Sequence, residues 1–322
     1  MAPITERRVA TNAIELNIAE LKPAGGEGPL VLLLHGFPES WYSWRHQFAP
    51  LADAGYHVVA PHMRGYGKSD RPEEITAYTQ VQVMADIAGL VPALGYESAI
   101  VIGHDWGAPT AWGCALHYPE LFSAVGALSV PFSPRAENPP MATLREAFKG
   151  QFFYQLYFQA PGVAEAEFEA DLRLALKKFL YMASGDADST TTLLMRGPDD
   201  DLLTGLEVPE ALPDWLTEED LDTYTAEFTA SGMRGPLNYY RNHDLTWELT
   251  AGAPTKISQP AMFAAGDRDG VIVMAADALE NLPTNVPDLR INELIPGIGH
   301  WTQQEAPEAV NKLLLKFLEE VS

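Results

Sequence analysis

Short apolar runs alternate with longer amphipathic stretches along most of the chain, and this alternation constrains the fold more than any other feature. The runs are VLLLHG, HVVAPHM, AIVIGHD, AVGALSV, PAMFAAGD and INELIPG. Stretches with helical spacing separate them, among them WYSWRHQFAPLADAG, YTQVQVMADIAGLVPAL and PEAVNKLLLKFLEEV. Continuous apolar runs are typical of strands buried on both faces of a parallel sheet. The pattern therefore predicts an α/β fold with a mostly parallel central sheet flanked by helices.

Two segments do not follow this alternation. Residues 8–21 alternate loosely before a Pro- and Gly-rich break, which indicates a hairpin-like start to the sheet. Between the fourth and fifth apolar runs the sequence reads mainly helical and holds no convincing buried strand. We therefore predict a core of residues 1–131 and 260–322 and an inserted, mainly helical lid of residues 132–259. Asp and Gly residues recur through 183–213, so we expect a loop-rich excursion from the lid in this segment.

The charge balance narrows the range of partners. The net charge is −23, from 44 acidic and 21 basic side chains, and no cluster of Lys or Arg stands out. Nucleic acids and anionic lipid surfaces would be repelled, so we expect neither nucleic-acid nor membrane binding. The single cysteine, Cys114, and the lack of a signal-peptide pattern lead us to expect a cytoplasmic protein. The oligomeric state is left open.

The segment Gly103-His-Asp-Trp-Gly107 joins an apolar run to a helical stretch. It matches the G-x-nucleophile-x-G turn, which exposes its central residue between a strand and a helix. Small residues two before and two after the centre avoid clashes with the backbone, and Gly103 and Gly107 fill these places. An Asp that only caps a turn is the alternative, but the strand before it and the helix after it favour Asp105 as a nucleophile.

An Asp at the centre of this turn decides the chemistry. A carboxylate that attacks an acyl carbon gives a reactive anhydride, whereas attack on a saturated carbon gives an ester. This argues against an esterase or peptidase and favours epoxides and alkyl halides as substrates. The ester must then be hydrolysed, which requires a base and a site for negative charge.

His300 is the candidate base because it alone follows the last apolar run, as the order nucleophile, acid, histidine requires. His35 and His104 flank Gly-rich turns and are expected to bond to the backbone. The remaining histidines lack motif context: His46, His57, His62, His117 and His243.

Two aspartates follow the apolar run PAMFAA and compete as the partner of His300. We favour Asp269, because Asp267 directly follows Gly266 and fits a turn-capping role. An ionised partner fixes the imidazole tautomer and stabilises the imidazolium that forms when water is deprotonated.

The backbone N–H groups of Phe37, in the turn HGFP, and of Trp106 are the candidate oxyanion hole. A tight HGFP turn without a catalytic role is the alternative. The histidines and acids lack metal-ligand spacing, so neither a metal nor an organic cofactor is expected.

Several motifs together resemble the epoxide hydrolases of the α/β-hydrolase fold, in particular the hydrolase domain of the mammalian soluble enzyme. They are HGFPESWYSWRHQ, MRGYGKSD, GHDWGA, YQLYFQAPGVAEAE, SGMRGPLNYYRN and GHWTQQEAP. The resemblance runs from about Arg8 to Phe317, is weakest across 183–213, and includes no counterpart of that enzyme's phosphatase domain. It implies that a small apolar epoxide and water are the substrates, that Asp105 carries a covalent ester, and that the product is a vicinal diol.

The resemblance also implies two lid tyrosines that donate hydrogen bonds to the epoxide oxygen. Matching the motifs puts them at Tyr154 and Tyr240, with Tyr157 and Tyr239 as neighbouring alternatives. A developing alkoxide does need an acid, but the residues alone could not select two of 12 tyrosines. The expected substrate-binding residues are Phe37, Trp41, Trp106, Tyr154, Gln155, Tyr240 and Trp301.

Three other functions remain as alternatives. Haloalkane dehalogenases share the fold and the Asp nucleophile, but typically resemble HGNP or HGEP where this chain has HGFP, and Phe37 offers no side-chain donor to a halide. Fluoroacetate dehalogenases carry Arg after the nucleophile, where this chain has Trp106. A non-catalytic receptor on the same fold is the third, and the intact set of Asp105, His300 and Asp269 argues against it.

Overall fold

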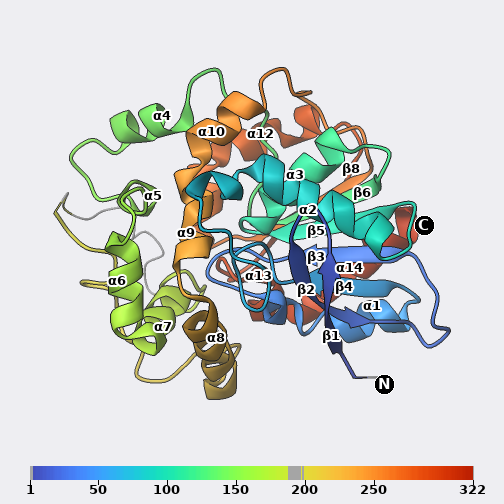
Figure 1. Ribbon diagram of the computed structural model, residues 1–322, viewed down its shortest axis with the longest axis horizontal. Coiled ribbons are helices and arrows are strands. Elements are labelled where there is room, and N and C mark those ends of the chain that lie inside the picture. The colour runs from blue at the N-terminus through green and yellow to red at the C-terminus, as the bar shows by residue number, and fades with distance from the viewer. Residues whose placement is uncertain (1–2, 188–196, 198, 322) are drawn as a thin grey trace.

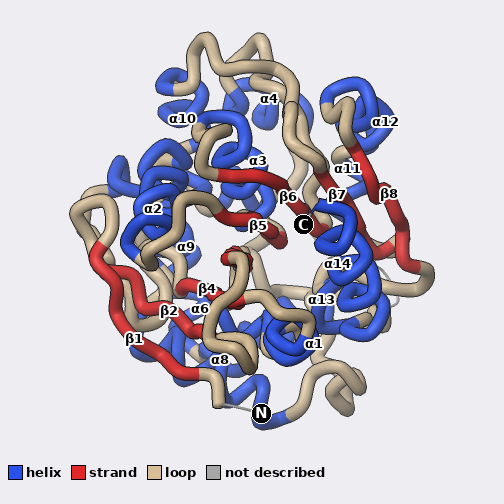
Figure 2. The backbone as a smooth tube through the Cα atoms, turned by 90° about the vertical axis from the view of Figure 1, so that its right-hand side faces the viewer, coloured by secondary structure: helices blue, strands red, loops and turns tan. Residues whose placement is uncertain are grey.

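The computed structural model describes residues 3–187, 197 and 199–321. These form an eight-stranded sheet in the order β1-β2-β4-β3-β5-β6-β7-β8, whose twist and edge strands β1 and β8 are visible in Figure 2. Only the pairs β1–β2 and β2–β4 are antiparallel among the described strands. The predicted mostly parallel sheet is therefore confirmed. The strands are β1 Thr5–Ala10, β2 Glu15–Leu21, β3 Leu30–Leu34, β4 His57–Pro61, β5 Ala99–His104, β6 Phe122–Leu128, β7 Ala261–Gly266 and β8 Leu289–Ile295.

Helices cover both faces of the sheet. Helices α2 and α3 pack with one apolar cluster, and α1 and α14 pack with a second cluster on the opposite face (Figure 2). None of the helices in the described part of the chain has the length and hydropathy needed to cross a bilayer. Outside the segment between β6 and β7, the helices of the described residues are η1 Trp41–Trp44, α1 Phe48–Asp53, η2 Ile75–Tyr78, α2 Gln80–Ala93, α3 Gly107–His117, α11 Gly270–Met274, α12 Ala276–Asn285, α13 Thr302–Glu305 and α14 Pro307–Val321.

Two local expectations need adjustment. The hairpin at the start of the sheet is present, but its turn lies at residues 11–14, where the N–H of Thr11 donates to the carbonyl of Ile14. The amphipathic stretch 41–55 is not one helix, because η1 ends at Trp44 and α1 begins at Phe48. A proline ring clashes with the carbonyl four residues before it, so Pro50 is accommodated only in the first turn of a new helix.

The segment between β6 and β7, which we call the insertion, is helical wherever it forms regular structure in the described residues. Figure 1 shows its helices gathered on one side of the sheet. Residues 199–213 contain neither helix nor strand, in line with the expected excursion, and part of 183–213 lies outside the described residues. The helices of the insertion are α4 Pro140–Ala147, α5 Tyr154–Tyr157, α6 Val163–Ala170, α7 Leu172–Met182, α8 Glu218–Ser231, α9 Arg234–Arg241 and α10 His243–Leu249.

Candidate active site

Asp105 lies at the sharp turn between β5 and α3, with a left-handed backbone φ of 48°. Side chains seldom adopt this conformation, and its cost is typical of functional turns. A Cβ atom at Gly103 would lie 2.0 Å from the carbonyl oxygen of Gly107, and one at Gly107 would lie 2.1 Å from that of Leu34. The expected need for small residues on both sides of Asp105 is therefore confirmed.

The two carboxylate oxygens of Asp105 have different surroundings. Oδ1 accepts a hydrogen bond from the backbone N–H of Phe37 at 2.7 Å, whereas Oδ2 lies 3.4 Å from Nε2 of His300. Burial works against ionisation, but His300, the nearby His104 and the Phe37 N–H together lower the pKa of Asp105 below its usual value. Asp105 is thus an anion at neutral pH, with Oδ1 held and Oδ2 facing the histidine.

The other ring nitrogen of His300 is held by Asp269. Nδ1 lies 3.1 and 3.0 Å from the two carboxylate oxygens, and the buried Asp269 is itself fixed by the N–H of Val271 at 2.8 Å. Burial alone would lower the pKa of His300, but the charges of Asp269 and Asp105 raise it well above its usual value. Asp267 instead accepts from the N–H of Gly297 at 2.7 Å. Of the two competing aspartates, the structure brings Asp269 to the histidine.

A buried network, which the sequence did not reveal, connects the turns that carry these groups. Nδ1 of His104 lies 2.7 Å from Oε2 of Glu39, and Nε2 lies 2.7 Å from the carbonyl oxygen of His300. Glu39 also accepts from the N–H of Gly36 at 3.1 Å, within the HGFP turn. No sequence signal points to Glu39, because an acid in a turn normally indicates solvent exposure, yet its side chain is fully buried. The expected backbone bond of His104 is confirmed.

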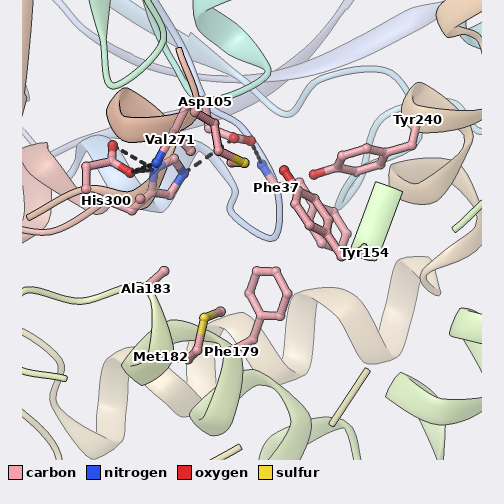
Figure 3. A pocket seen from close by; sticks show the side chains of 12 residues that line it. Phe37, Asp105, Tyr154, Phe179, Met182, Ala183, Tyr240, Val271 and His300 are labelled. Carbon is pink, nitrogen blue, oxygen red and sulfur yellow. Dashed lines mark hydrogen bonds and ion pairs between the residues drawn. The ribbon is translucent and has the colours of Figure 1, made fainter. Parts of the chain in front are cut away.

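Tyr154 begins α5 and Tyr240 lies near the end of α9, so both come from the insertion. They line a cavity together with Asp105, and in Figure 3 their hydroxyl ends point toward Asp105. Their ring centroids are 5.9 Å apart. Burial raises the pKa of both phenols well above the usual value, so both remain proton donors at neutral pH.

The neighbouring tyrosines have other partners. The hydroxyl of Tyr157 donates to Glu167 at 2.8 Å, and that of Tyr239 donates to the carbonyl of Arg64 at 2.9 Å. Nε2 of Gln155 donates to the phenol oxygen of Tyr154 at 3.0 Å, which leaves the Tyr154 proton free for another acceptor.

Two cavities meet at Asp105. The first, which we call the small cavity, measures about 60 Å³ and extends past His300 to Phe179 and Met182 of α7 (Figure 3). The second, which we call the large chamber, measures about 780 Å³ and extends away from His300 beneath α4 and α10. The wall of the large chamber includes Gln80, Trp106, His117, Arg135, Leu144, Gln155, Tyr240, His243 and Trp247.

Two of the expected substrate-binding residues lie elsewhere. Trp41 packs against Tyr42 and Phe48, with ring centroids 5.8 and 5.9 Å away. Trp301 is fully buried and donates from Nε1 to the carbonyl of Leu180 at 2.6 Å. Neither lines either cavity. The cavities do include the other expected residues, namely Phe37, Trp106, Tyr154, Gln155 and Tyr240.

Comparisons with known proteins agree with this architecture. Residues 29–307 match the family described as the alpha/beta hydrolase fold. The chain is 44% identical to epoxide hydrolase A of Mycobacterium tuberculosis, over 99% of this chain and 98% of that protein. It is 39% identical to epoxide hydrolase 1 of Siraitia grosvenorii, over 99% and 100%. A solved epoxide hydrolase from an endophytic Streptomyces superposes with a TM-score of 0.95 at 43% identity, covering 100% of this chain and 97% of that one.

Proposed function

The chain belongs to the epoxide hydrolases of the α/β-hydrolase fold, and we propose that it converts an epoxide to a vicinal diol through a covalent ester on Asp105. One arrangement carries the proposal. The ionised Asp105 has a histidine on one side and two phenols on the other, and all of them line one cavity. Such a site can attack a saturated carbon, protonate the oxygen that leaves it, and then activate water.

In the first step Oδ2 of Asp105 attacks one carbon of the epoxide ring. A new C–O bond forms to the carboxylate while the ring C–O bond breaks, and the ring oxygen takes a proton from one of Tyr154 and Tyr240. Hydrogen bonds from both phenols favour the negative charge that develops on that oxygen. The bond from Phe37 to Oδ1 supports Oδ2 as the attacking atom, because Oδ1 is already engaged.

In the second step His300 takes a proton from water, and the resulting hydroxide adds to the carboxyl carbon of the ester. The N–H groups of Phe37 and Trp106 would stabilise the tetrahedral oxyanion. Its collapse restores the carboxylate of Asp105 and releases the diol. The proton that His300 took from water then passes to the tyrosinate, so the cycle consumes one water. The charge of Asp269 stabilises the imidazolium that exists between these events.

We further propose that residues 1–131 and 260–322 act as the core and 132–259 as a lid over the nucleophile. The position of the insertion between β6 and β7, and its supply of Tyr154 and Tyr240, support this division. A cytoplasmic location is part of the proposal, and the one cysteine, which is free and buried, fits a reducing compartment.

A turnover screen tests the proposed function. The purified protein is offered aryl and long-chain aliphatic epoxides alongside haloalkanes, and diol and halide are measured separately, with Asp105→Ala as the control. Diol formation that disappears in the Asp105→Ala variant is expected. Halide release without diol formation would indicate a dehalogenase, and binding without turnover would indicate a receptor.

A further inference from the structure

The two cavities meet at the reacting groups and differ greatly in size. Asp105, Tyr154 and Tyr240 line both of them, so an epoxide held between the carboxylate and the phenols lies at the junction. The small cavity measures about 60 Å³ and the large chamber about 780 Å³. A cavity of the smaller size has room for only a few groups as large as a water molecule or a methyl group. The large chamber, in contrast, can take a whole organic substituent.

The geometry of the epoxide ring distributes its substituents between these spaces. In a trans-disubstituted epoxide the two substituents lie on opposite faces of the three-membered ring and point away from each other. When Tyr154 and Tyr240 hold the ring oxygen and Asp105 faces one ring carbon, one substituent enters the large chamber and the other is directed toward the small cavity. A terminal epoxide carries only hydrogen on its second carbon, so it needs almost no space there.

His300 restricts the small cavity further, because the water for ester hydrolysis needs the same space. His300 lines the small cavity and does not line the large chamber. Its Nδ1 is held by Asp269 at 3.0 Å, so Nε2 has to take the proton from a water molecule on the small-cavity side. A long substituent in the small cavity would exclude this water. The space therefore suits hydrogen or a methyl group on the second carbon.

Phe179 and Met182 of α7 form the wall of the small cavity across from the catalytic groups. Both side chains line this cavity and are buried, and Figure 3 shows them pointing from α7 toward the space below Asp105 and His300. The ring of Phe179 also lies 5.7 Å from the ring of Phe37. Neither Phe179 nor Met182 lines the large chamber. These two side chains therefore limit the small cavity without limiting the large chamber.

The end of α7 is bonded to the loop that carries His300, so this wall is held in place. The N–H of His300 donates to the carbonyl of Ala183 at 2.8 Å. Nε1 of Trp301 donates to the carbonyl of Leu180 at 2.6 Å. These two carbonyls belong to residues on either side of Met182 in the chain. A long substituent would have to break these bonds or compress a packed wall, and closely packed interiors resist compression.

We propose that Phe179 and Met182 make this protein selective for epoxides that carry one large substituent and no more than a methyl group on the other ring carbon. Terminal epoxides with one bulky substituent are then the preferred substrates. The proposal rests on the proposed function and names the substrate class of the same site.

The test uses three epoxides with the same large substituent: a terminal one, one with a trans methyl group and one with a trans butyl group on the second carbon. The methyl and butyl epoxides have the same substitution pattern, so the ratio of their kcat/KM values reports size and not ring reactivity. We expect the parent to favour the methyl epoxide by about 100-fold or more, because each surplus methylene in a filled pocket is costly. Phe179→Ala and Met182→Ala should each lower this ratio by about tenfold or more.

Phe148→Ala is the matched control, because Phe148 lines the large chamber and does not line the small cavity. Its ratio should equal that of the parent. Both kcat/KM values scale with the folded fraction of a variant, so partial misfolding leaves their ratio unchanged.

Three results would overturn the inference while the proposed function stands. They are equal hydrolysis of the methyl and butyl epoxides by the parent, a ratio unchanged in both Phe179→Ala and Met182→Ala, and a ratio lowered as much by Phe148→Ala. A parent that forms no diol from any of the three epoxides would refute the proposed function instead.

Discussion

Nε2 of His300 lies 3.4 Å from Oδ2 of Asp105, so the proposed base faces the carboxylate whose ester it must later hydrolyse. This contact, together with Asp269, raises the pKa of His300 well above its usual value, against the effect of burial. Formation of the ester removes the charge of Asp105 and with it part of that effect. The imidazole should therefore lose its proton more readily at the stage when a base is needed.

This coupling predicts that Asp105→Asn lowers the pKa of His300. The Asn side chain keeps the shape of the carboxylate but not its charge, so it imitates the neutral ester. An NMR titration of the imidazole in the parent and in the variant measures the shift, which should exceed about one unit given the separation of the charges. An unchanged or higher pKa in Asp105→Asn would show that Asp105 does not control the base.

The same charges give the two half-reactions different pH profiles. Attack needs an ionised Asp105, whose pKa is lowered, and protonated phenols, whose pKa values are raised, so its rate should be flat across neutral pH. Hydrolysis needs a neutral His300, so its rate should rise with pH through the pKa of His300 in the ester. Stopped-flow measurement of ester formation and decay in single turnovers checks both profiles, and two profiles of equal slope would contradict the division of roles.

Tyr154 and Tyr240 are predicted to share the charge of the opening ring. Each single change to Phe should slow ring opening by much less than Asp105→Ala does, and the double change should nearly abolish it. Tyr157→Phe and Tyr239→Phe are the matched controls, since their hydroxyls bond to Glu167 and to the carbonyl of Arg64 instead. Near-parental kinetics in the double variant, with loss of activity in the controls, would show that the assignment of the lid tyrosines is wrong.

Asp269→Asn is predicted to lower the rate of ester hydrolysis by about 10⁴-fold, because only a carboxylate at this position both orients the imidazole and stabilises its charge. Asp267→Asn should have little effect, since Asp267 bonds to the backbone of Gly297. Single-turnover hydrolysis rates decide the ranking. The reverse order would transfer the role of acid to Asp267.

The tight turn at Asp105 predicts a stability effect as well. Gly107→Ala would put a Cβ atom 2.1 Å from the carbonyl oxygen of Leu34, which is backbone and cannot move aside easily. We expect the free energy of unfolding to fall by about 3 kcal/mol or more. Gly25→Ala is the control, because a Cβ atom there meets nothing within 4 Å. Urea unfolding that shows equal stability for both variants would contradict the steric argument.

The sequence predicted the parts of the site that lie on the sheet better than those on the insertion. Strand, turn and helix patterns located Asp105, and the position after the last strand located His300, because parallel strands bring their carboxyl ends together. Phe179 of α7, which lines the small cavity, was not found, since packing between distant segments decides which face of a lid helix points inward.

The expectations that differ from the structure concern the direction in which side chains point. They do not concern where the motifs lie in the fold. Trp301 is among the expected substrate-binding residues, but it is fully buried and bonds to the carbonyl of Leu180 in the insertion. Adjacent side chains leave the backbone in different directions, so proximity along the chain does not place two of them in one cavity. The lid tyrosines were found only by resemblance to a family, since nothing in their local sequence distinguishes them.

The covalent ester is the central claim, and His300→Gln tests it most directly. Asp105 is already an anion and needs no base for attack, whereas hydrolysis of the ester does need one. Intact mass spectrometry of His300→Gln after mixing with an epoxide should show an increase equal to the whole mass of the epoxide. Peptide digestion should locate the added mass in the segment that contains Asp105. If His300→Gln carries no added mass on Asp105 while the parent converts the same epoxide to its diol, the covalent mechanism is refuted.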